Sequence, residues 1–339
     1  MTLAISAERV ATPRLTLNVL SIPGSSGDPV LFVHGNVSSS AFWRSTMTAV
    51  AAEGFRPYAV DLRGFGDSDP EPVDASRGVR DYSDDVLALL DRIGPAHLVG
   101  WSLGGGVVMQ ALRDRPAAAR SVTLVNPVSP YGFGGTVGPD GVLTGSDGVG
   151  AGGGAANPDF VAALQAGDRS ADSPVSPRNV LRATYVAPGT DLGEEEDAYV
   201  ESMLSTRIGD DHYPGDALPS DAWPNVAPGK RGVLNTIAPP NFRIDDLHEI
   251  DPKPPILWIR GDQDVIVSDT SMFDLAHLGA IGAVPGWDGT PAQPMVTQTR
   301  AALDRYGLYR EVVIKGAGHG PQLDRPEEFR AALLAHLRG

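Results

Sequence analysis

The feature that most constrains this chain is the motif Gly-Trp-Ser-Leu-Gly at residues 100–104. A short apolar run leads into the motif and a helix-compatible segment follows it, which is the strand–turn–helix context of a nucleophile elbow. Ser102 would then stand at the tip of a strained turn, and Gly100 and Gly104 would let neighbouring backbones pass close by. Its hydroxyl would face a helix N-terminus, where backbone N–H groups favour developing negative charge. The motif alone also fits an ordinary turn, but its setting predicts a nucleophile at Ser102.

Strand-like and helix-like segments alternate on both sides of this motif. Segments of strand character lie at 15–22, 29–33, 56–60, 98–101, 121–125, 256–259 and 309–314. Segments of helix character lie at 41–52, 79–93, 103–115, 270–278, 295–306 and 326–337. The run at 29–33 is continuously apolar, as in a strand that is buried on both faces. The alternation predicts an α/β fold in which helices cover both faces of a mostly parallel, doubly wound sheet.

The alternation stops between residues 127 and 252. Glycine dominates the part from 131 to 156, and short helix candidates follow at 158–166, 177–185 and 194–206. We interpret this segment as an inserted, mainly helical cap over the carboxyl ends of the strands, where open α/β sheets bind ligands. The sequence therefore predicts a core of residues 1–126 and 253–339 and a cap or lid of residues 127–252. The glycine-rich stretch 132–154 fits either a lid that gates the site or a disordered surface loop.

Charge and composition limit the partners that this chain can take. Its 339 residues carry a formal net charge of −15 and no cysteine. A negative field disfavours nucleic acid and anionic membranes, and the missing thiols exclude a disulfide framework and a thiolate zinc site. No apolar run is long enough to span a bilayer and no secretory signal is visible, so we expect a cytoplasmic protein. We expect a small neutral substrate and no metal or organic cofactor, and the sequence indicates no oligomeric state.

A serine nucleophile needs a base within hydrogen-bond reach and an acid that orients the base. His319 lies in a glycine-flanked loop after the last strand, and we predict that it is the general base. The alternative is a loop histidine without a chemical role. Asp264 follows the strand at 256–259 and is the predicted acid, with Asp262 as the alternative. The end of the strand at 121–125 offers no acid, because Asn126 stands there.

An oxyanion intermediate would need two hydrogen-bond donors. The backbone N–H of Leu103, next to the nucleophile, is the first candidate, and the N–H of Asn36, in the loop after residue 33, is the second. His34 is interpreted as a structural residue that ties this loop to its neighbours. Three residues near these loops are predicted to contact the substrate, namely Trp101, Trp43 and Val265.

Together these motifs resemble the α/β-hydrolase superfamily, with a cap inserted after the sixth strand. The resemblance rests on five segments in the expected order, at 34–36, 61–68, 100–104, 261–264 and 318–319. It implies the α/β-hydrolase fold and a Ser-Asp-His chain order for the triad. The loop at 34–39 is similar to that of haloalkane dehalogenases, but those enzymes and the similar epoxide hydrolases use an aspartate nucleophile. Ser102 at this position disfavours alkyl-halide and epoxide chemistry.

The resemblance and the serine together imply acyl transfer. The expected function is hydrolysis of a carboxylic ester or lactone of a small to medium apolar substrate through an acyl-enzyme. One alternative is hydrolysis of a C–C bond in a diketone or ring-fission product, whose carboxylate would need an arginine near Ser102. Candidates in the predicted cap are Arg178, Arg182, Arg207, Arg231 and Arg243. The remaining alternative is a scaffold of the same fold that binds a ligand without catalysis.

Overall fold

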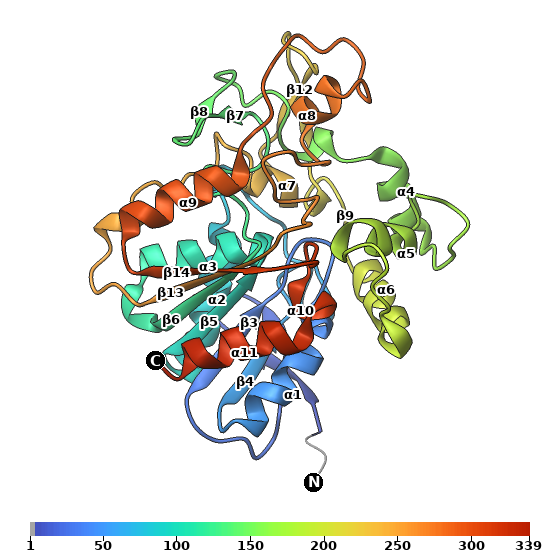
Figure 1. The fold of residues 1–339 in the computed structure, drawn as a ribbon. Helices are drawn as coiled ribbons and strands as arrows, with labels where there is room; N and C mark the ends of the chain where they lie inside the picture. The colour runs from blue at the N-terminus through green and yellow to red at the C-terminus, as the bar shows by residue number, and fades with distance from the viewer. Residues whose placement is uncertain (1–3) are drawn as a thin grey trace.

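An eight-stranded sheet forms the centre of the computed structural model, which describes residues 4–339 (Figure 1). Its strands are β1 (Ser6–Ala11), β2 (Thr16–Ser21), β3 (Pro29–Val33), β4 (Arg56–Val60), β5 (Ala96–Trp101), β6 (Ala119–Val125), β13 (Ile256–Gly261) and β14 (Tyr309–Ile314). Their order across the sheet is β1-β2-β4-β3-β5-β6-β13-β14. β2 runs antiparallel to β1 and β4, and every other pairing in this sheet is parallel. The predicted α/β architecture is confirmed.

Helices bury both faces of the sheet (Figure 1). These helices are α1 (Arg44–Ala52), α2 (Arg80–Ile93), α3 (Leu103–Asp114), α9 (Met295–Tyr306) and α11 (Pro326–Leu337). α1 packs beside α11, and α2 packs beside α3. Because the helices cover both faces, all residues of the central strands β3 and β5 are buried. The edge strand β1 was not predicted from the sequence, since its mostly exposed residues show no apolar pattern.

The chain leaves the sheet after β6 and returns to it only at β13. The intervening segment, 127–252, is here called the insertion. It contains the helices α4 (Pro158–Ala166), α5 (Pro177–Val180), α6 (Glu196–Leu204) and α7 (Val233–Thr236) and a π-helical turn (Leu181–Tyr185). It also contains the short strands β7 (Thr136–Val137), β8 (Val142–Leu143), β9 (Ile208–Gly209), β10 (Tyr213–Pro214), β11 (Ala217–Pro219) and β12 (Val226–Pro228). These six strands pair only with one another and not with the central sheet.

A second excursion, residues 268–294, separates β13 from α9 and carries α8 (Leu275–Ala280). The sequence predicts a helix at 270–278, but the helix begins later because Asp274 is its N-cap and accepts the N–H of Ala276. Figure 1 shows α8 near β12, beyond one end of the sheet, and a Cβ atom at Gly279 on α8 would lie 2.7 Å from the Trp223 ring of the insertion. The insertion and the second excursion therefore cover the same end of the core.

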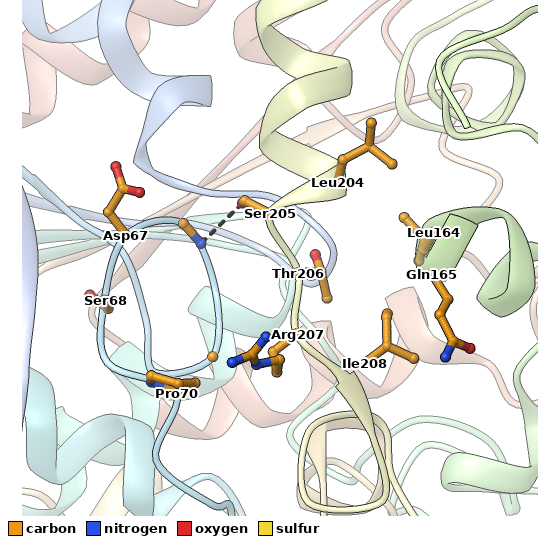
Figure 2. Close-up of a pocket in the computed structure, with 12 residues that line it drawn as sticks. Asp67, Ser68, Pro70, Leu164, Gln165, Leu204, Ser205, Thr206, Arg207 and Ile208 are labelled. Atoms are coloured by element: carbon orange, nitrogen blue, oxygen red, sulfur yellow. Dashed lines mark hydrogen bonds between the residues drawn. The ribbon is translucent and has the colours of Figure 1, made fainter. Parts of the chain in front are cut away.

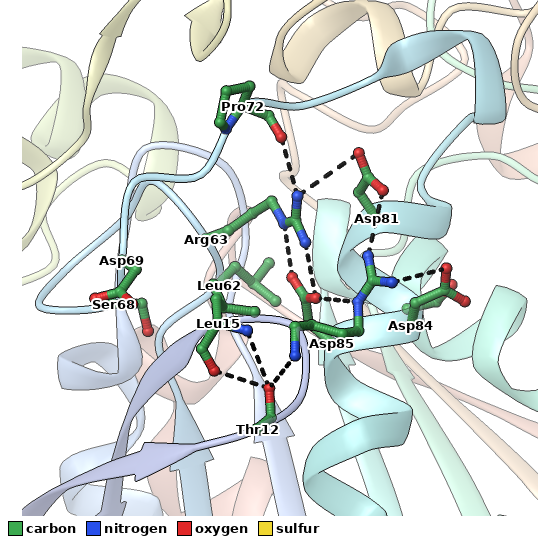
Figure 3. A network of polar contacts seen from close by, with 12 residues as sticks. Thr12, Leu15, Leu62, Arg63, Ser68, Asp69, Pro72, Asp81, Asp84 and Asp85 are labelled. Atoms are coloured by element: carbon green, nitrogen blue, oxygen red, sulfur yellow. Dashed lines mark hydrogen bonds and ion pairs between the residues drawn. The ribbon is translucent and has the colours of Figure 1, made fainter.

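A buried network of ion pairs anchors the loop that follows β4 (Figure 3). Arg63 donates from Nε and Nη2 to the two carboxylate oxygens of Asp85, at 2.7 and 2.8 Å, and from Nη1 to the carbonyl of Pro72 at 2.9 Å. Arg14 donates to the same Asp85 carboxylate at 2.6 Å. The Asp85 side chain is 1% exposed. One carboxylate on α2 therefore fixes two arginines from other parts of the core.

Removing this carboxylate is expected to destabilise the fold strongly. Asp85→Ala removes both close carboxylate contacts of the buried Arg63 guanidinium and leaves it only the carboxylate of Asp81, at 3.7 Å. Breaking a comparable buried pair costs about 3–5 kcal/mol. The measurement is the shift in thermal or urea midpoint. Asp91→Ala on the same helix is the matched control, because Asp91 is 63% exposed in its pair with Arg115 and such pairs contribute about 0–1 kcal/mol. Equal shifts for the two variants would contradict this account of the network.

Candidate active site

Ser102 occupies a strained turn between β5 and α3. Its backbone has φ 56° and ψ −119°, a conformation that costs a non-glycine residue about 1–3 kcal/mol. The Ser102 carbonyl accepts the N–H groups of Gly105 (2.9 Å) and Val128 (3.1 Å), which hold the turn in place. A Cβ atom at Gly100 would lie 2.3 Å from the carbonyl oxygen of Gly104, and one at Gly104 would lie 2.4 Å from that of Val33. The two motif glycines are therefore required by close backbone contacts.

His319 and Asp264 meet at the ends of β14 and β13. Nδ1 of His319 lies 2.9 Å from Oδ2 of Asp264, and both side chains are 3% exposed. The other carboxylate oxygen accepts the backbone N–H groups of Ile266 (2.8 Å) and Val267 (3.1 Å). These bonds fix the carboxylate so that it accepts a hydrogen bond from Nδ1–H, which leaves Nε2 as the basic nitrogen. The alternative acid, Asp262, is exposed and accepts the N–H of Gly316 instead.

Ser102 and His319 line the same cavity, and the predicted oxyanion donors border it as well. Within residues 4–339 the Ser102 hydroxyl forms no hydrogen bond with a protein group, and it lines the same cavity as the imidazole. No protein acceptor in that range receives the backbone N–H of Leu103 or of Asn36. A Cβ atom at Gly35 would lie 3.0 Å from the Cβ of Ser102, so the loop that carries Asn36 packs directly on the nucleophile.

The loop that carries Asn36 is held by His34 and Tyr185. His34 accepts the N–H of Leu62 at Nε2 (2.9 Å), so its Nδ1 carries the proton and donates to the carbonyl of Gly35 (2.7 Å). Burial lowers the pKa of His34, which keeps the ring neutral. The Tyr185 hydroxyl, from the insertion, donates to the Asn36 carbonyl at 2.9 Å. The interpretation of His34 as a structural residue agrees with these contacts.

The cavity above Ser102 has a volume of about 370 Å³ and an uncharged lining. The core supplies Asn36, Val37, Ser102, Leu103 and His319, and Val128 stands at the start of the insertion. The insertion supplies mainly apolar residues, among them Phe133, Phe160, Val175, Tyr185, Tyr213 and Ile237. Residues after Asp264 complete the wall with Ile266, Val267, Met272, Phe273, Leu275 and Leu278. No aspartate, glutamate, lysine or arginine is among the described residues that border this cavity.

The three predicted substrate contacts are not among these lining residues, and the structure gives a reason in each case. Trp43 is fully buried and packs in the core against Phe32 and Phe329, with ring centroids 5.0 and 6.3 Å apart. Trp101 is fully buried behind the base loop and donates from Nε1 to the carbonyl of His319 at 2.8 Å. Val265 is half-buried, and the turn around Asp264 directs the two following side chains into the cavity instead.

Sequence reasoning missed the contribution of the second excursion. Met272 and Phe273 border the cavity and are still 45% and 41% exposed, so they form part of its rim. Leu275 and Leu278 on α8 line it further along the chain. The sequence of the second excursion did contain a signal for this contribution, namely large apolar residues in a stretch otherwise rich in glycine, proline and polar residues.

Hydrogen bonds hold the glycine-rich stretch 132–154 against the rest of the fold. The N–H of Gly134 donates to Oε1 of Gln293 (2.6 Å), that of Gly150 to the carbonyl of Val226 (2.9 Å), and that of Gly153 to Oδ1 of Asn235 (2.9 Å). Residues 150–152 also border the cavity. In this structure the stretch is a fixed part of the cavity wall.

A larger hollow of about 550 Å³ lies between the loop at 64–70 and residues 204–208 (Figure 2). It carries none of the predicted catalytic residues. Arg207 borders this hollow and not the cavity above Ser102. The smaller cavity is therefore the candidate active site, because it is the one that joins the strained serine to the histidine–carboxylate pair.

Two features bear on the expected partners and cofactors. In the described part of the chain, no helix is both long enough and apolar enough to cross a bilayer. Among the same residues, no group of three or more histidine, cysteine, aspartate or glutamate side chains is arranged so that it could hold a metal ion.

Comparison with known proteins places the chain in a family. The model of the alpha/beta hydrolase family matches residues 30–332. The RutD protein of Variovorax paradoxus, provisionally named a carbamate hydrolase, is 39% identical over 104 residues, which make up 30% of this chain and 39% of that protein. Epoxide hydrolase 2 of Siraitia grosvenorii is 32% identical over 115 residues, 33% of this chain and 36% of that protein. The matches thus span little more than a third of the length of these curated relatives.

The fold is also shared over nearly the whole chain. The esterase EaEST from Exiguobacterium antarcticum superimposes with a TM-score of 0.64 at 16% sequence identity, covering 98% of this chain and 100% of that one. At this identity the likeness concerns the fold alone. The family match over most of the sequence, together with the observed sheet and its nucleophile elbow, shows that the chain belongs to the alpha/beta hydrolase family.

Proposed function

We propose that this protein hydrolyses uncharged carboxylic esters or lactones through a covalent acyl-serine intermediate. The observation that carries the proposal is the convergence of three groups on one cavity: the strained Ser102, the His319–Asp264 pair and two backbone N–H groups without a protein acceptor. These are the parts that acyl transfer requires. The insertion acts in this proposal as a cap, because its apolar side chains supply much of the wall around the reacting groups.

The proposed reaction has two halves. Ser102 Oγ attacks the ester carbonyl carbon while His319 Nε2 takes the hydroxyl proton, and the N–H groups of Leu103 and Asn36 bind the oxyanion. The C–O bond to the alcohol then breaks, and the alcohol leaves with the proton from His319. Water attacks the acyl-enzyme with His319 again as the base, and the acid leaves as Ser102 regains its proton. Asp264 stabilises the imidazolium in both halves.

The uncharged lining supports a neutral substrate. A carboxylate brought into this cavity would lose its hydration without gaining a cationic partner, which is costly. The arginines proposed from the sequence are engaged elsewhere: Arg178 and Arg182 pair with Glu196, Arg231 with Asp211, and Arg243 with Asp245. We therefore do not favour hydrolysis of a ring-fission acid. Ser102 likewise speaks against the epoxide chemistry named for one relative, since the epoxide hydrolases of this fold use an aspartate.

A matched pair of substrates tests the preference for neutral molecules. The p-nitrophenyl ester of butyric acid and the mono-p-nitrophenyl ester of succinic acid have similar size, but the second carries a carboxylate. We expect kcat/KM to be about 10²-fold or more higher for the butyrate, because an uncompensated buried charge costs several kcal/mol. Initial rates at fixed ionic strength provide the measurement. Equal kcat/KM values would contradict the argument from the lining, and a lack of turnover with detectable binding would favour a non-catalytic scaffold.

A further inference from the structure

Asn126 joins the strand that carries the acid to the loop that carries the base. It is the first residue after β6 and is 2% exposed. Its Nδ2 donates to the carbonyls of Gly318 (3.0 Å) and His319 (2.8 Å), and its Oδ1 accepts the N–H of Gly261 (3.2 Å). Both N–H donors and the oxygen of this carboxamide are therefore engaged between the ends of β13 and β14.

The contact that Asn126 bridges is a close one. A Cβ atom at Gly261 would lie 2.2 Å from the carbonyl oxygens of both Ala317 and Gly318. The backbones of the acid strand and the base loop therefore touch, and a small shift of one moves the other. The His319 carbonyl also accepts Nε1–H of Trp101, the residue before the nucleophile. Two donors from neighbouring strands thus fix the backbone of the histidine.

Only a carboxamide meets the chemical demands at this position. Two carbonyl oxygens need hydrogen donors, and the N–H of Gly261 needs an acceptor on the same side chain. A carboxylate would place an anionic oxygen against two carbonyl oxygens and repel both. The backbone adds a second demand, because φ is 38° at residue 126, in the left-handed region that asparagine, aspartate and glycine tolerate best.

We propose that Asn126 is a positioning residue that aligns the His319 imidazole between Ser102 and Asp264. The proposal builds on the acyl-transfer function proposed above. Asn126 touches neither substrate nor the reacting atoms, and it acts through the backbone of residues 318 and 319. The position at the end of β6 does not supply the acid in this protein, because the Asn126 side chain there donates hydrogen bonds to the loop that carries His319.

The test compares Asn126→Asp and Asn126→Gly with Asn179→Asp. Asn179 is the matched control because its Nδ2 also donates to two backbone carbonyls, those of Ala171 (2.9 Å) and Ser173 (2.8 Å), at a place outside the proposed catalytic groups. The readouts are thermal midpoint, kcat and KM for the best neutral ester, and the ring protonation of His319. The ring protonation of His319 is measured by nitrogen NMR of ring-labelled histidine. The signals of His319 are identified by their loss in His319→Gln.

We expect Asn126→Asp to lower kcat by about 10²-fold or more with KM changed by less than about threefold, because small misalignments of a catalytic group have effects of this size. Asn126→Gly keeps the backbone conformation and should lose less, since it removes the donors without adding repulsion. The signals of His319 should change from a single Nδ1-protonated form to a mixture in Asn126→Asp. Asn179→Asp should lower the thermal midpoint and leave kcat and the His319 signals unchanged.

Wild-type kcat and unchanged His319 signals in Asn126→Asp would overturn the positioning role. A fall in thermal midpoint without a fall in kcat per folded molecule would do the same, because it would reduce Asn126 to a structural residue. If the wild-type protein hydrolysed no ester, the proposed function would fail, and the NMR readout would still decide whether Asn126 sets the state of His319.

Discussion

Ser102→Ala is expected to reduce hydrolysis of p-nitrophenyl butyrate by about 10⁴–10⁶-fold, because the covalent route is lost and only binding and oxyanion stabilisation remain. The fold should survive, since alanine fits the same space and keeps the same backbone strain. Ser102→Gly should be equally inactive and more stable by about 1 kcal/mol, because glycine adopts φ 56° without strain. Steady-state rates and thermal midpoints on the same preparations provide the measurement.

Ser76→Ala is a suitable control for the Ser102 variants. Ser76 is an exposed serine whose hydroxyl donates to Asp74, and neither residue is among those that line the cavity. We expect its kcat/KM to match that of the unaltered protein. A Ser102→Ala variant that kept more than about a hundredth of the wild-type rate would exclude Ser102 as the nucleophile.

Asp264→Asn is expected to lower kcat by about 10⁴-fold while the protein stays folded, as in other triads where the acid becomes an amide. The reason is visible in the contacts of Asp264. One of its oxygens accepts two backbone N–H groups, so an asparagine there would place its own oxygen at that position. Its NH₂ group would then face Nδ1 of His319, which would have to accept a hydrogen bond instead of donating one. The proton would move to Nε2, and the base toward Ser102 would be lost.

Asp262→Asn tests which of the two aspartates proposed from the sequence, Asp264 or Asp262, is the acid of the triad. Asp262 is exposed and accepts only the Gly316 N–H, which an asparagine oxygen can also do. We expect its kcat to stay within about threefold of the wild-type value. The reverse ranking, with Asp262→Asn inactive and Asp264→Asn active, would show that the acid was assigned to the wrong residue.

The sheet and the elbow could be predicted because their physical demands appear locally in the sequence. Strands buried on both faces read as continuous apolar runs, and the close contacts around Ser102 leave glycine at positions 100 and 104. The pairing of His319 with Asp264 followed from the same logic, since each stands just after a strand of a parallel sheet. Strand ends in such a sheet meet at one edge.

The cavity wall could not be predicted in this way. Trp43 and Trp101 are close to the candidate loops in sequence, but proximity along the chain does not say which way a side chain points. Both are in the core. Most of the residues that border the cavity come from the insertion and the second excursion, and their apolar side chains meet only through packing between distant segments.

Composition also misled the interpretation of the glycine-rich stretch. Many glycines imply a flexible chain when nothing else binds it. Here the partners that bind it are Gln293, Asn235 and the carbonyl of Val226, which lie about 70 to 160 residues further along the chain. Contacts of this range do not appear in a local sequence pattern. They contradict the disordered loop, and the lid stays a prediction.

Trapping the covalent intermediate tests the central claim most directly. The protein is treated with diethyl p-nitrophenyl phosphate, whose phosphorus is attacked by an activated serine with loss of p-nitrophenolate, and the adduct is located by peptide mass spectrometry. We predict one diethylphosphoryl group per chain, on Ser102, and none on the same peptide of His319→Ala within the same time. An unmodified Ser102 in a preparation that still hydrolyses esters would contradict the account.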